Sequence, residues 1–210
     1  MFTIEDLHKT NSIYNIPKTV TVNKGVLLDF RLFNALINPS EERDYKYDFD
    51  VFLHKYGINL QRPYVWEHCQ QNEFISSILL EKPIEPVIVV QHICDQSREN
   101  SINYIIDGKQ RLMTIQKFGH NEFPIIVNDP LQSYEVYYKD FSDELKRYFQ
   151  SRVNYLTANV YYSYWNAPIT DDMKIILFNY YNFAGTQQTE EHKKKLQSLL
   201  KQQKNKDKNE

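Results

Sequence analysis

The chain has 210 residues and a formal net charge of −2. This length corresponds to one domain, or to one domain with an appendage, and it is ample for a sizeable hydrophobic core. A charge so close to neutral gives no overall attraction to nucleic acid, so any contact with DNA would have to come from a local basic patch.

Cysteine usage and hydropathy set two further limits. Cys69 and Cys94 lie far apart and form no paired motif, so we expect neither a disulfide framework nor a zinc site. No apolar stretch approaches the roughly twenty residues that a membrane helix needs, and the N-terminus lacks the pattern of a secretory signal. We therefore expect a cytoplasmic protein with no membrane contact.

Residues 1–57 are expected to form either an N-terminal extension that binds a partner or an elaborated edge of the main domain. Two short strands are predicted at 19–22 and 26–28, with a turn at 23–25 between them. An Asn-Pro-Ser sequence at 38–40 predicts a later loop.

A motif with several polar and aromatic residues, Leu-Gln-Arg-Pro-Tyr-Val-Trp-Glu, occupies 60–67. A helix is predicted after it, because four residues form one apolar stripe: Phe74, Ile75, Ile78 and Leu79. Pro83 and Pro86 should end that helix. The aliphatic run at 87–90 predicts a buried strand, and the polar stretch 95–101 predicts a hairpin-like loop.

The most informative segment is Tyr-Ile-Ile-Asp-Gly-Lys-Gln-Arg-Leu-Met-Thr at 104–114. An aliphatic run that ends in Asp-Gly predicts a strand followed by a tight turn. The apolar spacing after it predicts a helix, with Gly119 placed to close it as a C′ glycine. The first helical turn would then present unpaired N–H groups and cationic side chains, which favour a bound anion such as phosphate. Asp-Gly is also an ordinary turn dipeptide, and the motif alone fits a purely structural role.

The remaining chain alternates strands and helices. Strands are predicted at 123–127, 134–138 and 159–164, with Pro124 at a strand start or an edge. Helices are predicted from 142–144 and from 170–172, the second with an apolar face of Met173, Ile176, Leu177 and Tyr180 and with Gly185 at its end. Residues 189–210 predict a charged helix that ends in a frayed tail, whose lysines could touch DNA phosphates.

Taken in order, the 60–67 motif, the helix, the two prolines, the strand and Ile-Ile-Asp-Gly-x-Gln-Arg resemble the N-terminal domain of GmrSD-type (type IV) restriction endonucleases. The resemblance covers about 60–118, with a weaker match at 176–186 to a Phe-x-x-x-Asn-x-x-Gly element. It implies an α+β protein with a ParB/sulfiredoxin-like fold, in which a small mixed sheet packs with helices. We place the domain at 58–188, between the N-terminal 1–57 and the C-terminal 189–210.

The resemblance also implies a function. Members of the family are expected to bind a nucleotide, often to hydrolyse a nucleoside triphosphate, and to serve bacterial defence against modified foreign DNA with a separate nuclease subunit or another protein partner. No zinc, haem or flavin is implied. The chain could be encoded by the host or by a phage.

The site residues follow from the two motifs. Asp107 and Arg111 are the candidate catalytic residues, Asp107 is the candidate Mg²⁺ ligand, and Tyr64 and Trp66 could stack on a base or form the pocket wall. The candidate nucleotide-binding residues are Gln61, Arg62, Gly108, Lys109, Gln110 and Thr114, and the weaker motif adds Asn182 and Gly185. Structural alternatives remain open, because Asp107 could cap the following helix and the two aromatic residues could belong to the core.

One position departs from the family pattern. The usual sequence is Asp-Gly-Gln-Gln-Arg, whereas this chain has Lys109 in place of the first glutamine. A lysine can attract phosphate but cannot accept a hydrogen bond, so nucleotide binding is expected to survive more readily than turnover. The cysteine that sulfiredoxins need in the corresponding loop is missing, which argues against peroxiredoxin repair.

Three functions therefore remain open. The first is a nucleotide-binding domain, with or without hydrolysis. The second is a stand-alone metal-dependent DNA nuclease, which is disfavoured because the six histidines are scattered and form no His-Asn-His region. The third is a non-catalytic interaction protein of phage or defence origin. All three require one spatial arrangement, in which Arg62 and Arg111 line the same pocket.

Overall fold

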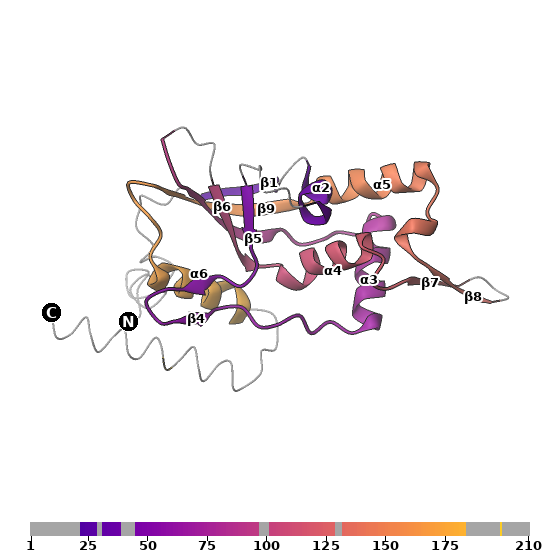
Figure 1. Ribbon diagram of the computed structural model, residues 1–210, viewed down its shortest axis with the longest axis horizontal. Helices are drawn as coiled ribbons and strands as arrows, with labels where there is room; N and C mark the ends of the chain where they lie inside the picture. Colours follow the sequence, from indigo (N-terminus) through magenta and orange to yellow (C-terminus); the bar gives the residue numbers. More distant parts are fainter. Residues whose placement is uncertain are drawn as a thin grey trace, which may run out of the picture.

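The computed structural model describes residues 22–28, 31–38, 45–96, 101–128, 132–183 and 198 (Figure 1). A five-stranded sheet runs through the protein in the order β1-β9-β5-β6-β2. Its strands are β1 (Val22–Leu27), β2 (Tyr45–Asp48), β5 (Val87–Ile93), β6 (Ser101–Asp107) and β9 (Thr157–Tyr164). β5 pairs antiparallel with β6 and parallel with β9, so the sheet is mixed.

The central strand β5 is buried on both faces. Val87 and Val89 point into one hydrophobic core, and Ile88 and Val90 point into a second core on the other side. Because successive side chains alternate across a strand, a run of four aliphatic residues is what a strand covered on both sides requires. The predicted buried strand is therefore confirmed.

Helices cover the two faces unequally. One face carries α2 (Leu32–Ile37), α3 (His68–Leu79), α4 (Lys109–Gly119) and α5 (Asp143–Asn154). The other face carries α6 (Asp171–Phe183), with the short hairpin of β3 (Phe52–Leu53) and β4 (Ile58–Asn59) beside it (Figure 1). The predicted α+β class is confirmed, and the assignment to a ParB/sulfiredoxin-like fold stays a prediction.

Most predicted elements form where the sequence indicated them. α3 buries Phe74, Ile75 and Ile78 and ends before the two prolines, and β5 and β6 form the predicted hairpin. Ser142 caps α5, where its Oγ accepts a hydrogen bond from Leu145 N at 3.2 Å. Thr170 acts in the same way at the start of α6. β7 (Ile125–Asn128) and β8 (Ser133–Val136) pair as a separate hairpin that projects at the end of the molecule remote from α6 (Figure 1).

The turn predicted at 23–25 is wrong. β1 continues through these residues as one strand, with an irregular register between Asn23 and Val26 and with Gly25 at a φ of 63°. A bulge uses the same glycine signal as a turn, since both need a positive φ. The predicted strand residues 19–21 and loop residues 39–40 lie outside the described residues.

The prediction that Gly119 is a C′ glycine is also wrong. Gly119 is the last residue of α4, and Asn121 instead takes the left-handed conformation, with a φ of 60°. A Cβ on Gly119 would lie 2.3 Å from Ile37 Cδ1. The close contact between α4 and α2 therefore leaves no room for a Cβ at this position unless the side chain of Ile37 moves.

The apolar face predicted for α6 is only partly correct. Leu177 is buried and Met173 packs against the core, whereas Tyr180 is 42% exposed. Ile175 and Phe178, which were not predicted to face the core, are buried. Four successive apolar residues wrap around more than one face of a helix, so the spacing did not determine which side packs on the sheet.

Within the segment 1–57, the described residues take part in the sheet and the core. β2 pairs parallel with β6 at one edge, and β1 pairs antiparallel with β9 at the other. α2 packs on α4 and α5, where Asn154 Oδ1 accepts a hydrogen bond from Phe33 N at 2.9 Å. None of the helices in the described ranges has the length and apolar content to cross a membrane.

Candidate functional site

The junction between β6 and α4 is shaped by Gly108. This residue has a φ of 107° and lies between Asp107, the last residue of β6, and Lys109, the first of α4. A Cβ at this position would lie 2.5 Å from Val87 Cγ1. The backbone angle and the contact with β5 both require glycine, a reason that does not involve a ligand.

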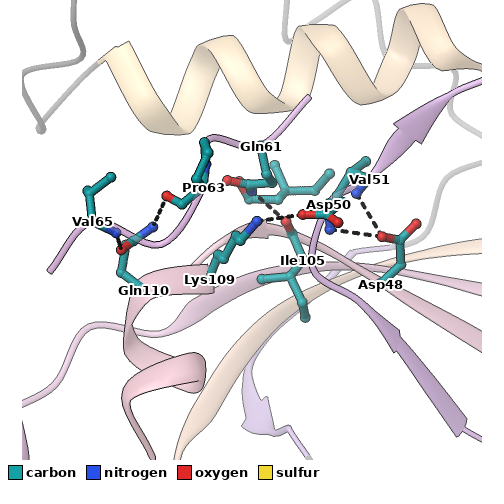
Figure 2. Close-up of polar contacts among 10 residues, drawn as sticks. Asp48, Asp50, Val51, Gln61, Pro63, Val65, Ile105, Lys109 and Gln110 are labelled. Atoms are coloured by element: carbon teal, nitrogen blue, oxygen red, sulfur yellow. Dashed lines mark hydrogen bonds and ion pairs between the residues drawn. The ribbon is translucent and has the colours of Figure 1, made fainter. Parts of the chain in front are cut away.

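The segment 60–67 is held across this junction by two glutamine side chains (Figure 2). Gln61 Nε2 donates to the carbonyl oxygens of Ile105 and Ile106 at 2.6 and 2.8 Å. Gln110 Oε1 accepts from Val65 N at 2.9 Å, and its Nε2 donates to Pro63 O at 3.1 Å. An amide can donate and accept at once, so these residues join the two sequence motifs in space.

A cavity of about 330 Å³ opens where the motifs meet. Its wall includes Arg62 from the first motif and Arg111 from the second, so the arrangement that the sequence required is present. α3 and the following loop complete the wall. The remaining lining residues are Gln61, Trp66, Phe74, Ser77, Pro83, Ile84, Glu85, Asp107, Gly108, Lys109 and Gln110.

Arg111 is already engaged within the protein. Its Nη2 lies 2.8 Å from Asp107 Oδ2, and its Nη1 donates to the main-chain oxygen of Glu85. Arg62, which is half-buried, makes no hydrogen bond or ion pair with another residue of the described ranges. Arg62 is therefore the cavity cation whose charge is most available to a ligand.

Lys109 points toward Asp50 instead of standing free in the cavity (Figure 2). Its Nζ lies 2.6 Å from Asp50 Oδ1, and its side chain is only 6% exposed. Asp50 was not among the residues expected from the sequence. No local pattern could reveal it, because the contact depends on the pairing of β2 with β6.

Tyr64 and Thr114 lie outside the cavity wall, contrary to the expected ligand contacts. Their side-chain oxygens are 2.8 Å apart, and Gln71 Nε2 donates to the tyrosine hydroxyl at 3.0 Å. Thr114 is fully buried and also donates to Gln110 O. Their hydrogen bond joins the segment 60–67 to α4, and neither side chain lines the cavity. Trp66 does line the cavity and packs edge-on against Phe74.

The weaker motif is described only as far as the end of α6. Asn182 lies in α6, on the other face of the sheet from α4, and no described residue of α6 lines the cavity. Gly185 lies outside the described residues.

Metal binding by protein side chains alone is not supported. The described part of the chain contains no group of three or more His, Cys, Asp or Glu residues that could hold an ion. Asp107 and Glu85 are the only acidic residues among those that line this cavity. Such a wall could hold Mg²⁺ only together with oxygens of a ligand, which is the usual arrangement for phosphate substrates.

Sequence reasoning missed Glu85, Phe74 and Ser77 as wall residues. Phe74 belongs to the helical stripe and Glu85 lies between the two prolines, so both were visible only as structural signals. Their place on the wall follows from the packing of α3 beside α4.

Comparison with known proteins identifies the family of the chain. The sequence model of the family described as GmrSD restriction endonuclease, N-terminal domain, matches residues 53–210. No curated protein and no solved structure matches the chain. The match covers well over half of the 210 residues and includes both motifs that form the cavity. The chain therefore belongs to the family of GmrSD restriction endonuclease N-terminal domains.

Proposed function

We propose that the cavity binds a nucleotide through its phosphates, and that the domain is the nucleotide-responding part of a restriction system directed at modified foreign DNA. The observation that carries the proposal is the meeting of Arg62 with the N-terminus of α4 on one cavity wall. A guanidinium and the unpaired N–H groups of a first helical turn are both suited to phosphate oxygens.

The rest of the wall supports the same ligand. Trp66, which packs edge-on against Phe74, provides an aromatic ring on which a base could stack. The volume of about 330 Å³ lies in the range of pockets for small molecules. Phosphate at Arg62 and a base at Trp66 would use opposite parts of one ligand.

Mg²⁺ is part of this proposal, with Asp107 as its protein ligand. A bound ion would neutralise phosphate charge, and ligand oxygens would complete its shell. The remaining chemistry belongs to the chain's own groups: Arg111 orients the carboxylate of Asp107, and Arg62 holds phosphate.

A second candidate is a non-catalytic nucleotide-binding partner of a separate nuclease subunit. The two candidate catalytic residues, Asp107 and Arg111, are paired with each other, and Lys109 is paired with Asp50. None of these three charged side chains is therefore left without a protein partner. Binding without turnover therefore also fits the geometry.

The test is nucleotide binding by wild type and by Arg62→Ala, measured by calorimetry with the four ribonucleoside triphosphates, with and without Mg²⁺. Arg62→Ala should weaken binding by roughly 10- to 100-fold, the range for a lost hydrogen bond to a charged group. Arg147→Ala, an exposed arginine outside this cavity, is the matched control and should bind normally.

Arg62 is a cleaner choice than Arg111, because Arg111→Ala would also leave Asp107 without its partner. Failure of the wild type to bind any of the nucleotides would overturn the proposal, as would equal affinity in wild type and Arg62→Ala. Phosphate release in the same samples separates the two candidates, since only the enzyme produces it.

A further inference from the structure

We propose that Asp50 is a positioning residue that decides which ligand charge the cavity accepts, because its carboxylate holds Lys109 away from the ligand as an internal counter-anion. This inference rests on the proposed function. It concerns the one position at which the chain departs from the usual Asp-Gly-Gln-Gln-Arg sequence.

Lys109 is buried and paired within the protein. Its side chain is 6% exposed and its ammonium is 2.6 Å from Asp50 Oδ1. Lysines are rarely buried unless they are paired. The ammonium is thus satisfied by the protein, although Lys109 stands beside Gly108 on the cavity wall.

Hydrogen bonds at its main-chain N and O hold Asp50 in place (Figure 2). Asp48 Oδ1 accepts hydrogen bonds from Asp50 N and Val51 N at 2.9 and 2.8 Å. Asp50 O accepts from both Leu60 N and Gln61 N at 3.1 Å. Val51 has a φ of 52°, a conformation that a valine keeps only when its surroundings impose it. This turn fixes the main chain of Asp50 between β2 and the segment that carries Arg62, which places the carboxylate within reach of Lys109.

Two of the three cations of the cavity wall are neutralised by carboxylates of the protein. Arg62, Lys109 and Arg111 are the cations of the wall. Asp107 neutralises Arg111, and Asp50, which is 58% exposed, neutralises Lys109. Arg62 is left to attract the ligand, so without a metal the cavity should accept a single phosphate nearly as well as three.

Removing the carboxylate should change this preference. Asp50→Asn leaves a buried ammonium without a counter-charge, which is strongly unfavourable. The ammonium can regain a partner by turning to the cavity and binding ligand phosphate. The expected sign is therefore tighter anion binding, whereas a purely structural ion pair would give weaker binding or no change.

The experiment measures binding of adenosine mono-, di- and triphosphate without metal, by calorimetry, on the full chain. Asp50→Asn should bind the triphosphate roughly tenfold tighter than wild type, as one more charged hydrogen bond allows, and the gain should grow with the number of phosphates. Asp50→Glu should keep wild-type affinities, because it can still pair with Lys109. Glu122→Gln breaks a comparable ion pair with Lys117 at the other end of α4 and should change nothing.

The Asp50→Asn/Lys109→Gln double variant provides a test that does not depend on the folding of Asp50→Asn, because it removes the buried ammonium together with its counter-charge. If Asp50 holds the lysine away from the ligand, the double variant changes affinity by less than about twofold, whereas a lost phosphate contact would weaken binding by roughly tenfold or more.

The outcomes separate the two proposals. A tenfold loss in the double variant, or unchanged or weaker binding by folded Asp50→Asn, overturns the role of Asp50 while Arg62→Ala still weakens binding. Absence of binding by the wild type overturns the proposed function and this inference with it.

Discussion

Two glycines at the ends of α4 illustrate how one residue type serves different needs. Gly108 takes a φ of 107° and touches Val87, whereas Gly119 is helical and touches Ile37. The sequence allowed us to predict the first, because Asp-Gly after an aliphatic run is a local signal. The prediction for Gly119 was wrong, because this glycine contacts Ile37 of α2, a helix far away in sequence.

Gly108→Ala should lower the free energy of unfolding by roughly 2–5 kcal/mol, since it adds backbone strain and a clash with Val87. Urea denaturation of the variant measures the loss. Gly57→Ala is the matched control, because Gly57 also has a positive φ, 65°, but its Cβ would meet no atom within 4 Å. The control should lose only about 1 kcal/mol. Equal losses in both variants would contradict the role assigned to Val87.

The ion pair of Asp50 with Lys109 could not be predicted from the sequence. Its partner Lys109 is 59 positions later, and nothing near Asp50 in sequence indicates a buried lysine. By contrast, the co-location of Arg62 and Arg111 followed from the family resemblance and is present in the structure. Motifs that line one cavity can be recognised in sequence through a family resemblance, whereas an ion pair that depends on strand register cannot.

At the scale of elements, α4 is the helix around which the site is organised. Its N-terminus forms the cavity wall, Gln110 holds the segment 60–67, and its C-terminus packs on α2. Helix starts were predictable, because caps such as Ser142 are local. The buried side of α6 was not, because its apolar run 175–178 fits several orientations.

Gly119→Ala tests the contact between α4 and α2. Alanine is the better helix former by about 1 kcal/mol, but its Cβ would collide with Ile37 Cδ1. We expect the substitution to destabilise the wild type by roughly 1–3 kcal/mol, the usual range for overpacking. In an Ile37→Ala background the same substitution should instead stabilise, as measured by urea denaturation. A loss of equal size in both backgrounds would show that the close contact is not the reason for glycine.

At the scale of the whole molecule, the sheet joins the two hydrophobic cores, and its stability responds to pH at His92. Burial and the positive charge of Lys174 both lower the pKa of His92 below its ordinary value of 6.5. The histidine lies on β5, and its Nδ1 is 3.1 Å from Ser163 Oγ on β9. The folded protein therefore disfavours the protonated form.

The sign of the effect follows from this pKa. The unfolded chain takes up the proton more readily, so the stability that neutral His92 provides is present above pH 6.5 and is lost as the pH falls below it. The urea midpoint of wild type should fall between pH 7.5 and pH 5, and His92→Gln should reduce that fall. His54→Gln, at an exposed position, should leave the fall unchanged. Parallel curves for wild type and His92→Gln would contradict the assignment.

The sheet order also has a consequence for the growing chain on the ribosome. β1 pairs only with β9 within the described residues, and Gly25 N donates to Asn159 Oδ1, 134 positions later. β1 therefore cannot pair with β9 until most of the chain has been synthesised. The bulge at Gly25 and the charge of Lys24 make the unpaired β1 a poor template for strand pairing with other chains. Nascent chains stalled before β9 should be the form most in need of chaperones.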